Sequence, residues 1–552
     1  MTNVANMESL TTDNAAIADY LERYASLLDL AGSSYYAVRA YRRAAELIRP
    51  LPTPVAELVR SGRARELRGI GPGLEARLRE LVETGEIAHA RELEGEVEPE
   101  LVGLGRFLGL SPKRAVELGR ALGARTAPEL RDAIASERLE RVPGVGPKTA
   151  ARLREALLRE DEPRARRGLL LNRARELAES LADALDGVAA GDPRRWADLS
   201  NRFAVVSSSP DVLDRFAALP SIVSVVERTA TRAVGLTVEG VPVELFVAEV
   251  ERFGTELVQA TGTRAFVESL GPLPDAPDEE RLFEALGLPY VPPELREGPY
   301  AGPPPPLLEL EQIRGDLHVH TTWSDGKASV LEMAQAAQAV GYGYLAICDH
   351  TPNVRVVPGL DADDVRRQGE EIAAANELVA PFRVLRGIEC DILPDGTLDL
   401  PDDVLAELDW VQASVHAGQR ATRDAITKRV VEALRHPSVS CLSHPKGRII
   451  NHRPENALDL ERAFEVALEG GKAVEVNGLP DRLDLRDVHV RLAVETGVPI
   501  VCSTDAHSTR GLGNMRLAVA TARRGAATAA DVLNTLALDE LTERYLRGRP
   551  SP

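Results

Sequence analysis

Short apolar runs alternate with longer amphipathic stretches over the C-terminal part of the chain, from about residue 312. The seven runs begin at Asp316, Tyr344, Arg383, Trp410, Val439, Ala473 and Val498. Between them lie stretches with helical spacing, such as 330–340, 362–379, 456–469 and 487–496. Strands that alternate with helices are typical of parallel sheets. Seven such units predict a closed barrel with one unit fewer than the eightfold form.

The N-terminal part has a different pattern, in which helices are joined by glycine-rich turns. Residues 14–87 have helical spacing, and one turn reads Leu67-Arg-Gly-Ile-Gly-Pro-Gly73. A second turn, Arg141-Val-Pro-Gly-Val-Gly-Pro-Lys-Thr-Ala150, matches a helix-hairpin-helix motif. Such turns free backbone N–H groups at a helix start, where they can hold a DNA phosphate without reading sequence. The predicted DNA contacts are Gly69, Gly71, Gly73, Gly144, Gly146 and Lys148.

The middle of the chain changes from helical to alternating spacing. Residues 202–207 read as a strand, and residues 233–247 alternate about a turn at Glu239-Gly240, as a hairpin does. This pattern predicts a small α/β unit. Residues 298–306 read Gly-Pro-Tyr-Ala-Gly-Pro-Pro-Pro-Pro, which is typical of an extended, semi-rigid linker.

Composition is typical of a globular protein with several domains. The chain has 552 residues, of which 44% are apolar. No apolar run follows Met1 and no stretch approaches a membrane span, so we expect a cytoplasmic protein without membrane contacts. The net charge of −19 argues against an overall basic nucleic-acid binder but leaves local contacts open. The 4 cysteines fall in or beside barrel strands, and we expect buried thiols rather than disulfides.

Histidines gather in the predicted barrel: of the 10 in the chain, only His89 precedes Asp316. His318 and His320 are two residues apart on a short strand, so both imidazoles leave on the same side. The later strands also end in metal-ligand residues, and barrels of this kind carry their chemistry at those ends. A lone histidine pair occurs by chance, but its repetition at strand ends does not. The pattern therefore predicts a metal site.

Residues from about 312 onward resemble the polymerase and histidinol phosphatase (PHP) family of metal-dependent phosphoesterases. The resemblance implies a distorted seven-stranded barrel that holds up to three divalent metals. It implies three ligand groups: His318, His320, Glu389 and Asp505; Glu389, His416 and His444; and Asp325, His350 and His507. In this arrangement Glu389 would bridge the first two metals.

The mixed imidazole and carboxylate ligands suit Zn, Mn or Fe rather than Mg alone. Paired metals lower the pKa of a shared water toward neutrality, so no serine or cysteine nucleophile is required. We expect Glu389 and Asp505 to act in catalysis. Arg448 and Arg482 lie just past strand ends, where they could clamp a phosphate, although an ordinary loop arginine explains each equally well.

The order of all these segments resembles the bacterial family X DNA polymerases. That family has an N-terminal helical domain, helix-hairpin-helix fingers, a palm, a thumb and a C-terminal PHP domain. The resemblance implies a multidomain α and α/β protein ending in a distorted (β/α)7 PHP barrel. The predicted boundaries are 1–88 for the N-terminal domain, 89–162 for the fingers, 163–262 for the palm, 263–297 for the thumb, 298–311 for the linker and 312–552 for the barrel.

The palm departs from the family pattern at its catalytic positions. The family carries Gly-Ser before an arginine pair, then Asp-x-Asp on a strand and a third Asp on the hairpin. Here the corresponding residues are Arg194 and Arg195 after Gly191-Asp-Pro, then Asn201, Phe203 and Glu244. Two-metal nucleotidyl transfer needs clustered carboxylates. We therefore predict that polymerase activity is lost or weak.

These observations favour a metal-dependent phosphodiesterase acting on DNA, as a 3′→5′ exonuclease or 3′-end-processing enzyme in repair. Its partner would be gapped or 3′-ended DNA, held without regard to sequence, and the sequence leaves protein partners unknown. Three alternatives stay open. The chain could be an active gap-filling polymerase with an exonuclease, a phosphatase of small monoesters or nucleotides, or a DNA-end-binding scaffold without catalysis.

Overall fold

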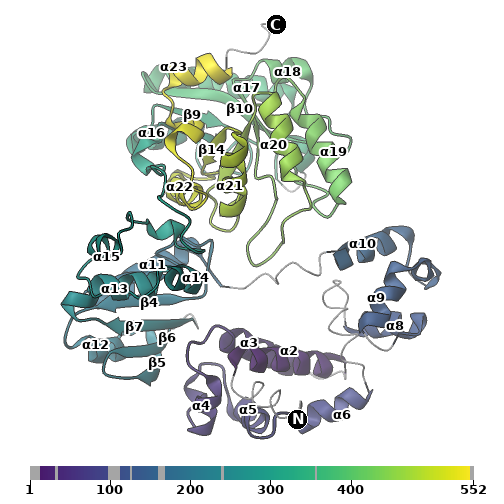
Figure 1. Ribbon diagram of the computed structural model, residues 1–552. Helices are drawn as coiled ribbons and strands as arrows, with labels where there is room; N and C mark the ends of the chain where they lie inside the picture. The colour runs from purple at the N-terminus through teal and green to yellow at the C-terminus, as the bar shows by residue number, and fades with distance from the viewer. Residues whose placement is uncertain are drawn as a thin grey trace. The chain divides into compact units, whose positions relative to one another are not determined.

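A computed structural model describes residues 13–30, 35–96, 112–124, 127–143, 145–158, 168–237, 241–354 and 357–546 (Figure 1). The chain forms two compact units. The first comprises Met1–Arg167, Leu181–Ala189 and Asn201–Val250, and the second comprises Gly168–Ser180, Ala190–Ser200 and Glu251–Pro552. Each unit is described by itself. The predicted multidomain α and α/β class is confirmed, whereas the individual domain boundaries stay predictions.

The larger part of the second unit is a nearly closed barrel of parallel strands. Its sheet has seven strands in the order β14-β13-β12-β11-β10-β9-β8. An isolated parallel bridge between Val319 and Ala506 brings its two end strands together. The strands are β8 (Gly315–Val319), β9 (Tyr344–Ile347), β10 (Arg383–Asp391), β11 (Trp410–Ser414), β12 (Cys441–Leu442), β13 (Ala473–Asn477) and β14 (Ile500–Ser503).

Helices follow the barrel strands and cover their outer face (Figure 1). They are α16 (Val330–Val340), α17 (Ala362–Val379), α18 (Asp402–Ala406), α19 (Arg423–Leu434), α20 (Leu460–Glu469), α21 (Asp487–Thr496) and α22 (Met515–Arg524). Local sequence fixes several ends. Ser329 and Glu332 form a capping box at the start of α16, and Gly341 ends the helix with φ of 100°. Asp361 begins α17 with a second capping box.

The barrel is apolar inside at one end and polar at the other. Tyr344, Leu385, Trp410 and Val501 form a buried cluster within the strands. A larger apolar cluster lies between the strands and the surrounding helices and includes Phe464. Because the apolar residues hold the strands in register, polar side chains at the carboxyl ends have fixed positions.

Short elements that precede the barrel in the sequence make up most of the rest of the second unit. They are β1 (Leu169–Leu170), β3 (Leu199–Ser200), η3 (Val250–Arg252), α13 (Phe253–Thr261), α14 (Arg264–Ser269), α15 (Glu279–Ala285), η4 (Pro293–Leu295) and η5 (Leu310–Gln312). After the barrel come η7 (Thr509–Asn514), η8 (Ala529–Asp531), η9 (Leu533–Thr535), α23 (Leu538–Leu541) and η10 (Thr542–Leu546). The predicted proline-rich linker ends at the barrel, where the buried Leu308 donates its N–H to Ala527 O.

The small α/β sheet has five strands in the order β2-β4-β7-β6-β5. They are β2 (Gly187–Gly191), β4 (Phe203–Ser207), β5 (Ile222–Arg228), β6 (Arg232–Thr237) and β7 (Pro242–Val247), accompanied by α11 (Leu171–Ala184) and α12 (Val212–Ala218). Strands β6 and β7 pair antiparallel, which confirms the predicted hairpin, although its turn at 238–240 lies outside the described residues.

The N-terminal segments of the first unit are helical, as predicted. They comprise α2 (Asn14–Leu30), α3 (Tyr35–Ile48), α4 (Val55–Arg60), η1 (Ala64–Glu66), α5 (Pro72–Thr84), α6 (Ala88–Glu96), α8 (Pro112–Leu122), α9 (Ala127–Ala135), η2 (Glu137–Arg141) and α10 (Pro147–Leu158). Leu21 and Leu78 share a buried cluster with Val226 and Leu236 of the small sheet. None of the helices in the described part of the chain is long and apolar enough to cross a membrane.

Candidate metal centre

Nine side chains from the carboxyl ends of the barrel strands gather in one place. They are His318, His320, Asp325, His350, Glu389, His416, His444, Asp505 and His507. Most are buried, because the strands that carry them converge at this end of the barrel. Parallel strands place their carboxyl ends at one edge, so residues far apart in sequence meet there.

Glu389 lies at the middle of this cluster. Its Oε1 is 2.8 Å from His444 Nε2 and 3.4 Å from His416 Nε2. Its Oε2 is 2.8 Å from His350 Nδ1 and 3.6 Å from His318 Nε2. Oε2 also lies 3.7 Å from His320 Nε2, so Oε1 faces two imidazoles and Oε2 faces three, an arrangement suited to a ligand shared between two cations.

Two further groups lie beside Glu389. His318, His320 and Asp505 form one, in which His320 Nε2 is 3.0 Å from Asp505 Oδ1. In the other, Asp325 lies between His350 and His507, with His507 Nε2 3.3 Å from Asp325 Oδ2.

The predicted ligand groups share only Glu389, whereas the groups that the structure shows share His320 and His350. His320 belongs to the Asp505 group and also to the Asp325 group. His350 faces Glu389 as well as Asp325, so that the third compact group is His350, Glu389 and His416. The assignment of each ligand to one metal stays a prediction.

Buried imidazole nitrogens without a hydrogen-bond partner are a second reason why these residues fit divalent cations. His318 Nε2, His320 Nδ1, His350 Nδ1 and His444 Nδ1 are buried without a hydrogen-bond partner. A buried polar atom without a partner is costly, and such atoms are rare unless a ligand completes them. Two of them, His318 Nε2 and His350 Nδ1, point toward Glu389 oxygens.

The close approach of carboxylates and imidazoles shifts several pKa values in the cluster. Burial alone would raise the pKa of Glu389, but the surrounding imidazoles, first His416 and His350, lower it well below its ordinary value. Burial opposes the charged form of His416, yet Glu389 and Asp391 raise its pKa to about 10. Burial and the neighbouring imidazoles lower the pKa of His320 to about 4. Divalent cations would displace the imidazole protons and balance the charge of the carboxylates.

Two carboxylates behind the ligands were not predicted from the sequence. Glu475 on β13 accepts from His318 Nδ1 at 2.6 Å and from His444 N at 2.7 Å. Asp391 accepts from His416 Nδ1 at 2.5 Å. Such partners fix the tautomer and orientation of a metal-binding imidazole. For Glu475 the available signal was a lone acidic residue inside an otherwise apolar strand, whereas Asp391 ends a strand that also carries Glu389 and two arginines.

The two predicted phosphate arginines differ in the structure. Arg448 is buried and donates to Arg482 O at 2.7 Å, to Leu483 O at 2.5 Å and to Asp198 Oδ2 at 2.6 Å. Backbone and carboxylate acceptors take these donors, which favours the alternative of an ordinary loop arginine, and the phosphate contact of Arg448 stays a prediction. Arg482 is half-buried, and its Nε lies 3.9 Å from Asp505 Oδ2, beside the metal ligands.

The arginine pair of the palm is bound within the protein. Arg194 donates to both carboxylate oxygens of Glu279, at 2.6 and 2.8 Å. Arg195 is buried and donates to Asp192 at 2.6 Å and to Glu297 at 3.0 Å. Neither guanidinium is placed as an open site for a triphosphate.

The three residues predicted at the polymerase carboxylate positions lie in or beside β4 and β7. Phe203 is fully buried at the start of β4 and pairs in register with Val243 on β7. Glu244 accepts from Arg232 Nη2 at 2.7 Å and lies 4.0 Å from Arg202. Asn201 precedes β4 and offers no carboxylate. Among the residues that the structure describes, groups of at least three candidate ligands close enough to hold a metal occur only in the barrel.

The glycine-rich turns of the first unit have open backbone. Gly69 has φ of 100°, a conformation that favours glycine, and Gly71 precedes α5 as its N-cap. A Cβ atom added at Gly69, Gly71, Gly73 or Gly146 would meet nothing within 4 Å. The predicted contact Gly144 lies outside the described residues, and Lys148 is exposed in the first turn of α10.

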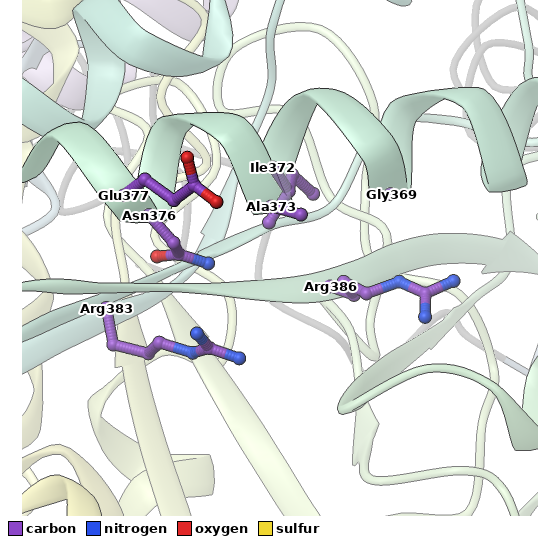
Figure 2. A pocket seen from close by; sticks show the side chains of 7 residues that line it. All are labelled: Gly369, Ile372, Ala373, Asn376, Glu377, Arg383 and Arg386. Carbon is purple, nitrogen blue, oxygen red and sulfur yellow. The ribbon is translucent and has the colours of Figure 1, made fainter.

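A pocket of 270 Å³ lies between α17 and β10 on the outer side of the barrel (Figure 2). It is lined by Gly369, Ile372, Ala373, Asn376, Glu377, Arg383 and Arg386. Its strand residues come from the first half of β10, whereas Glu389 lies near the carboxyl end of that strand. None of the nine clustered ligands lines it, so it is separate from the candidate metal centre.

Three family models match the helical N-terminal segments and the barrel. Residues 12–87 match a family model described as a helix-hairpin-helix domain, 104–158 a SAM-like helix-hairpin-helix tandem, and 316–478 a PHP domain. A Bacillus subtilis protein named "DNA polymerase/3'-5' exonuclease PolX" is 34% identical over 562 residues, which cover 96% of this chain and 98% of that protein.

Two shorter relatives cover the barrel region. A protein of Acetivibrio thermocellus named "Probable phosphatase" is 31% identical over 207 residues, or 36% of this chain and 81% of that protein. A Thermoanaerobacter protein with the same description is 30% identical over 232 residues, or 40% of this chain and 89% of that protein.

Proposed function

The chain belongs to the PolX family of family X DNA polymerases with a C-terminal PHP domain, and on that premise we propose that its barrel is a metal-dependent 3′→5′ exonuclease acting in DNA repair. The observation that carries the proposal is the cluster of buried imidazoles around both oxygens of Glu389. The helix-hairpin-helix segments would hold the substrate, gapped or 3′-ended DNA, by its backbone.

The nine ligands would hold up to three divalent ions, with Mn, Zn or Fe favoured by their mixture of imidazole and carboxylate. Bound ions would supply activation of water and neutralisation of charge on a phosphoryl oxygen. The assignment to Mn or Zn is part of the proposal.

The residues around the cluster favour direct attack by water on phosphorus. All four cysteines are buried, and burial raises the pKa of thiols such as Cys348 and Cys441, so neither offers a thiolate. Arg482, beside Asp505, is placed to bind a non-bridging oxygen of the scissile phosphate. Water would form the new P–O bond as the bond to the 3′ oxygen breaks, releasing a nucleoside monophosphate.

Glu475 and Asp391 would hold the imidazoles for this reaction. Each accepts from a ring nitrogen of a predicted ligand, which leaves the opposite nitrogen of His318 or His416 facing Glu389. This fixed orientation excludes other tautomers and reduces the reorganisation that metal binding requires.

We propose further that polymerase activity is lost or weak. Asn201 and Phe203 replace two carboxylates, and the third position, Glu244, is paired with Arg232. Without a group of carboxylates the palm lacks the ligands that hold Mg²⁺ for nucleotidyl transfer.

The test is one assay on labelled 3′-recessed and gapped DNA with Mn²⁺, with and without deoxynucleotides. It compares the wild type with Glu389→Ala and with Glu465→Ala, a control at an exposed residue of α20. We expect the primer to shorten with the wild type and the control but not with Glu389→Ala. Shortening that survives in Glu389→Ala would exclude the barrel as the nuclease. Lengthening with deoxynucleotides would disprove the loss of polymerase activity.

A second candidate function is hydrolysis of small phosphate monoesters, which the two phosphatase relatives favour. The discriminating measurement is turnover of a chromogenic monoester in the same preparations. Monoester hydrolysis that depends on Glu389, together with intact DNA, would replace the exonuclease proposal.

A further inference from the structure

Arg448 ties the barrel to a segment outside it. This arginine follows β12 and lies four residues after the predicted ligand His444. Its Nη1 donates to Oδ2 of Asp198, in the segment 190–200 that leads from β2 toward β4 of the small sheet. Its other donors are used by Arg482 O and Leu483 O in the loop after β13. Asp198 is thus the charged partner of a guanidinium that is 8% exposed.

The two loops that Arg448 joins both carry parts of the metal centre. The first contains His444, which faces Glu389. The second contains Arg482, which approaches Asp505. Further bonds connect the loops: Lys446 N donates to Asp484 Oδ1 at 3.2 Å.

The second loop is also fastened to β13, the strand that carries Glu475. Asn477 N donates to Asp484 O at 2.7 Å, and Leu485 N donates to Glu475 O at 3.1 Å. A shift of Arg448 would therefore move His444 through the first loop. It would also move the residues next to Glu475 through the second loop.

The backbone of these loops depends on outside support. Non-glycine residues with positive φ include His444 at 23°, Asn451 at 66° and Leu483 at 44°. Such conformations are unfavourable for side-chain-bearing residues and persist only where surrounding contacts hold them. Arg448 donates directly to the carbonyl of Leu483, and Asn451 is held by Gly168, whose O accepts from its Nδ2 at 2.9 Å.

An apolar cluster places Asp198 beside Arg448. Leu171 packs with Ile450 and Leu483 of the two barrel loops, and Trp196 and Leu199 contact the same cluster. Trp196 and Leu199 flank Asp198 in sequence, so its carboxylate is held in position by its neighbours. The contact is consequently built from both apolar packing and an ion pair.

We propose that Asp198 is a positioning residue for the metal centre, acting through Arg448 on the loops that carry His444 and Arg482. The expected effect of Asp198 on DNA cleavage rests on the proposed function, whereas its expected effect on metal binding does not. Loss of the Asp198 carboxylate would leave the buried Arg448 guanidinium without its charged partner, and the loops would relax around it. The segment between β2 and β4 of the small sheet would thereby support the metal centre of the barrel.

The experiment measures Mn²⁺ binding to the full chain by calorimetry, and kcat and KM for DNA cleavage in parallel. Asp198→Ala is compared with Asp275→Ala, which removes a carboxylate from an exposed ion pair with Arg252 in the same unit. We expect Asp198→Ala to weaken Mn²⁺ binding and lower kcat by about tenfold each, in the range seen for residues that orient metal ligands. KM for DNA should not rise, because the change removes a negative charge. Asp198→Glu should recover part of both losses.

Mn²⁺ binding by Asp198→Ala that equals binding by Asp275→Ala would overturn the proposal. If Asp198→Ala does not fold, Asp198→Asn takes its place, since it keeps one acceptor oxygen and nearly the same volume, while it removes the charge and replaces the other oxygen by an NH2 group. Several-fold weaker Mn²⁺ binding by Asp198→Asn supports the proposal, and binding like the wild type overturns it. A wild type that binds Mn²⁺ but leaves DNA intact would refute the exonuclease, while the calorimetric comparison would still decide the role of Asp198.

Discussion

Glu475→Gln should weaken metal binding without a large change of shape. The buried carboxylate of Glu475 accepts from His318 Nδ1, Ser443 Oγ, His444 N, Asn477 Nδ2 and Ser503 Oγ, at 2.5 to 3.3 Å. Burial would raise its pKa, but His318 lowers it below the ordinary value, so the group is ionised at neutral pH. Glutamine has nearly the same volume but replaces one acceptor oxygen by an NH2 donor.

The size of the effect follows from which donors lose their acceptor. The serine hydroxyls can turn, whereas the N–H of His444 and the ring N–H of His318 cannot. An NH2 group at either carboxylate position therefore opposes one of these fixed donors. A hydrogen bond to a charged group contributes about 1.5–3 kcal/mol. Because about 1.4 kcal/mol is a factor of ten in affinity, we expect Mn²⁺ to bind about 10–100-fold more weakly.

Isothermal titration of Mn²⁺ into apo-protein measures this change directly. Glu465→Gln is the matched control, since Glu465 is exposed on α20 and pairs only with Arg462 among the contacts that the structure describes for it. The nuclease kcat should fall together with the affinity. Equal Mn²⁺ affinity in Glu475→Gln and the control would refute the view that Glu475 orients His318 and His444 for metal binding.

Three other predictions concern stability and DNA binding. Glu279 is buried between Arg194 and Arg296, which lower its pKa to about 2 despite burial, so it stabilises the fold above pH 4.5 and loses this effect as the pH falls toward 2. The shift corresponds to about 3 kcal/mol, and urea unfolding should show a deficit for Glu279→Gln at pH 7 that shrinks below pH 4. Mn²⁺ at 100 times its Kd should raise the free energy of unfolding by about 2.7 kcal/mol, and thermal unfolding should show EDTA reversing this in the wild type, with little response in Glu389→Ala. Lys148→Ala should weaken DNA binding. In filter-binding or anisotropy titrations, the negative slope of log K against log salt should become less steep by about 1. An unchanged slope would exclude a phosphate contact.

Much of the barrel could be predicted from local sequence alone. The predicted segments 330–340, 362–379 and 487–496 coincide with α16, α17 and α21. Helix ends of this kind are encoded by neighbouring residues, such as the capping box at Ser329 and the left-handed Gly341. The gathering of His, Asp and Glu side chains could be predicted for a related reason: parallel strands present their carboxyl ends together, so position along each strand predicts position in space. The choice of the nine predicted ligands came instead from the resemblance to the PHP family.

The sequence could not reveal which partner each buried charge has. Arg448 occupies the expected place for a phosphate ligand, yet Asp198, 250 residues earlier, binds it. The sequence shows Glu475 only as a polar residue in an apolar strand, and its contacts with His318 and Ser503 appear only in the folded structure. Likewise, only the folded structure shows that His320 belongs to two ligand groups.

Local sequence thus determined the helices, the strand order along the chain and the residue types at the strand ends, because these depend on neighbours within a few positions. Tertiary structure alone decided the partners of buried charged side chains such as Arg448 and Glu475. A buried carboxylate or guanidinium pairs with the closest opposite charge in a region of low dielectric, and for these two residues that neighbour comes from a distant segment. For Arg448 this difference separates a phosphate ligand from a structural support of the metal centre.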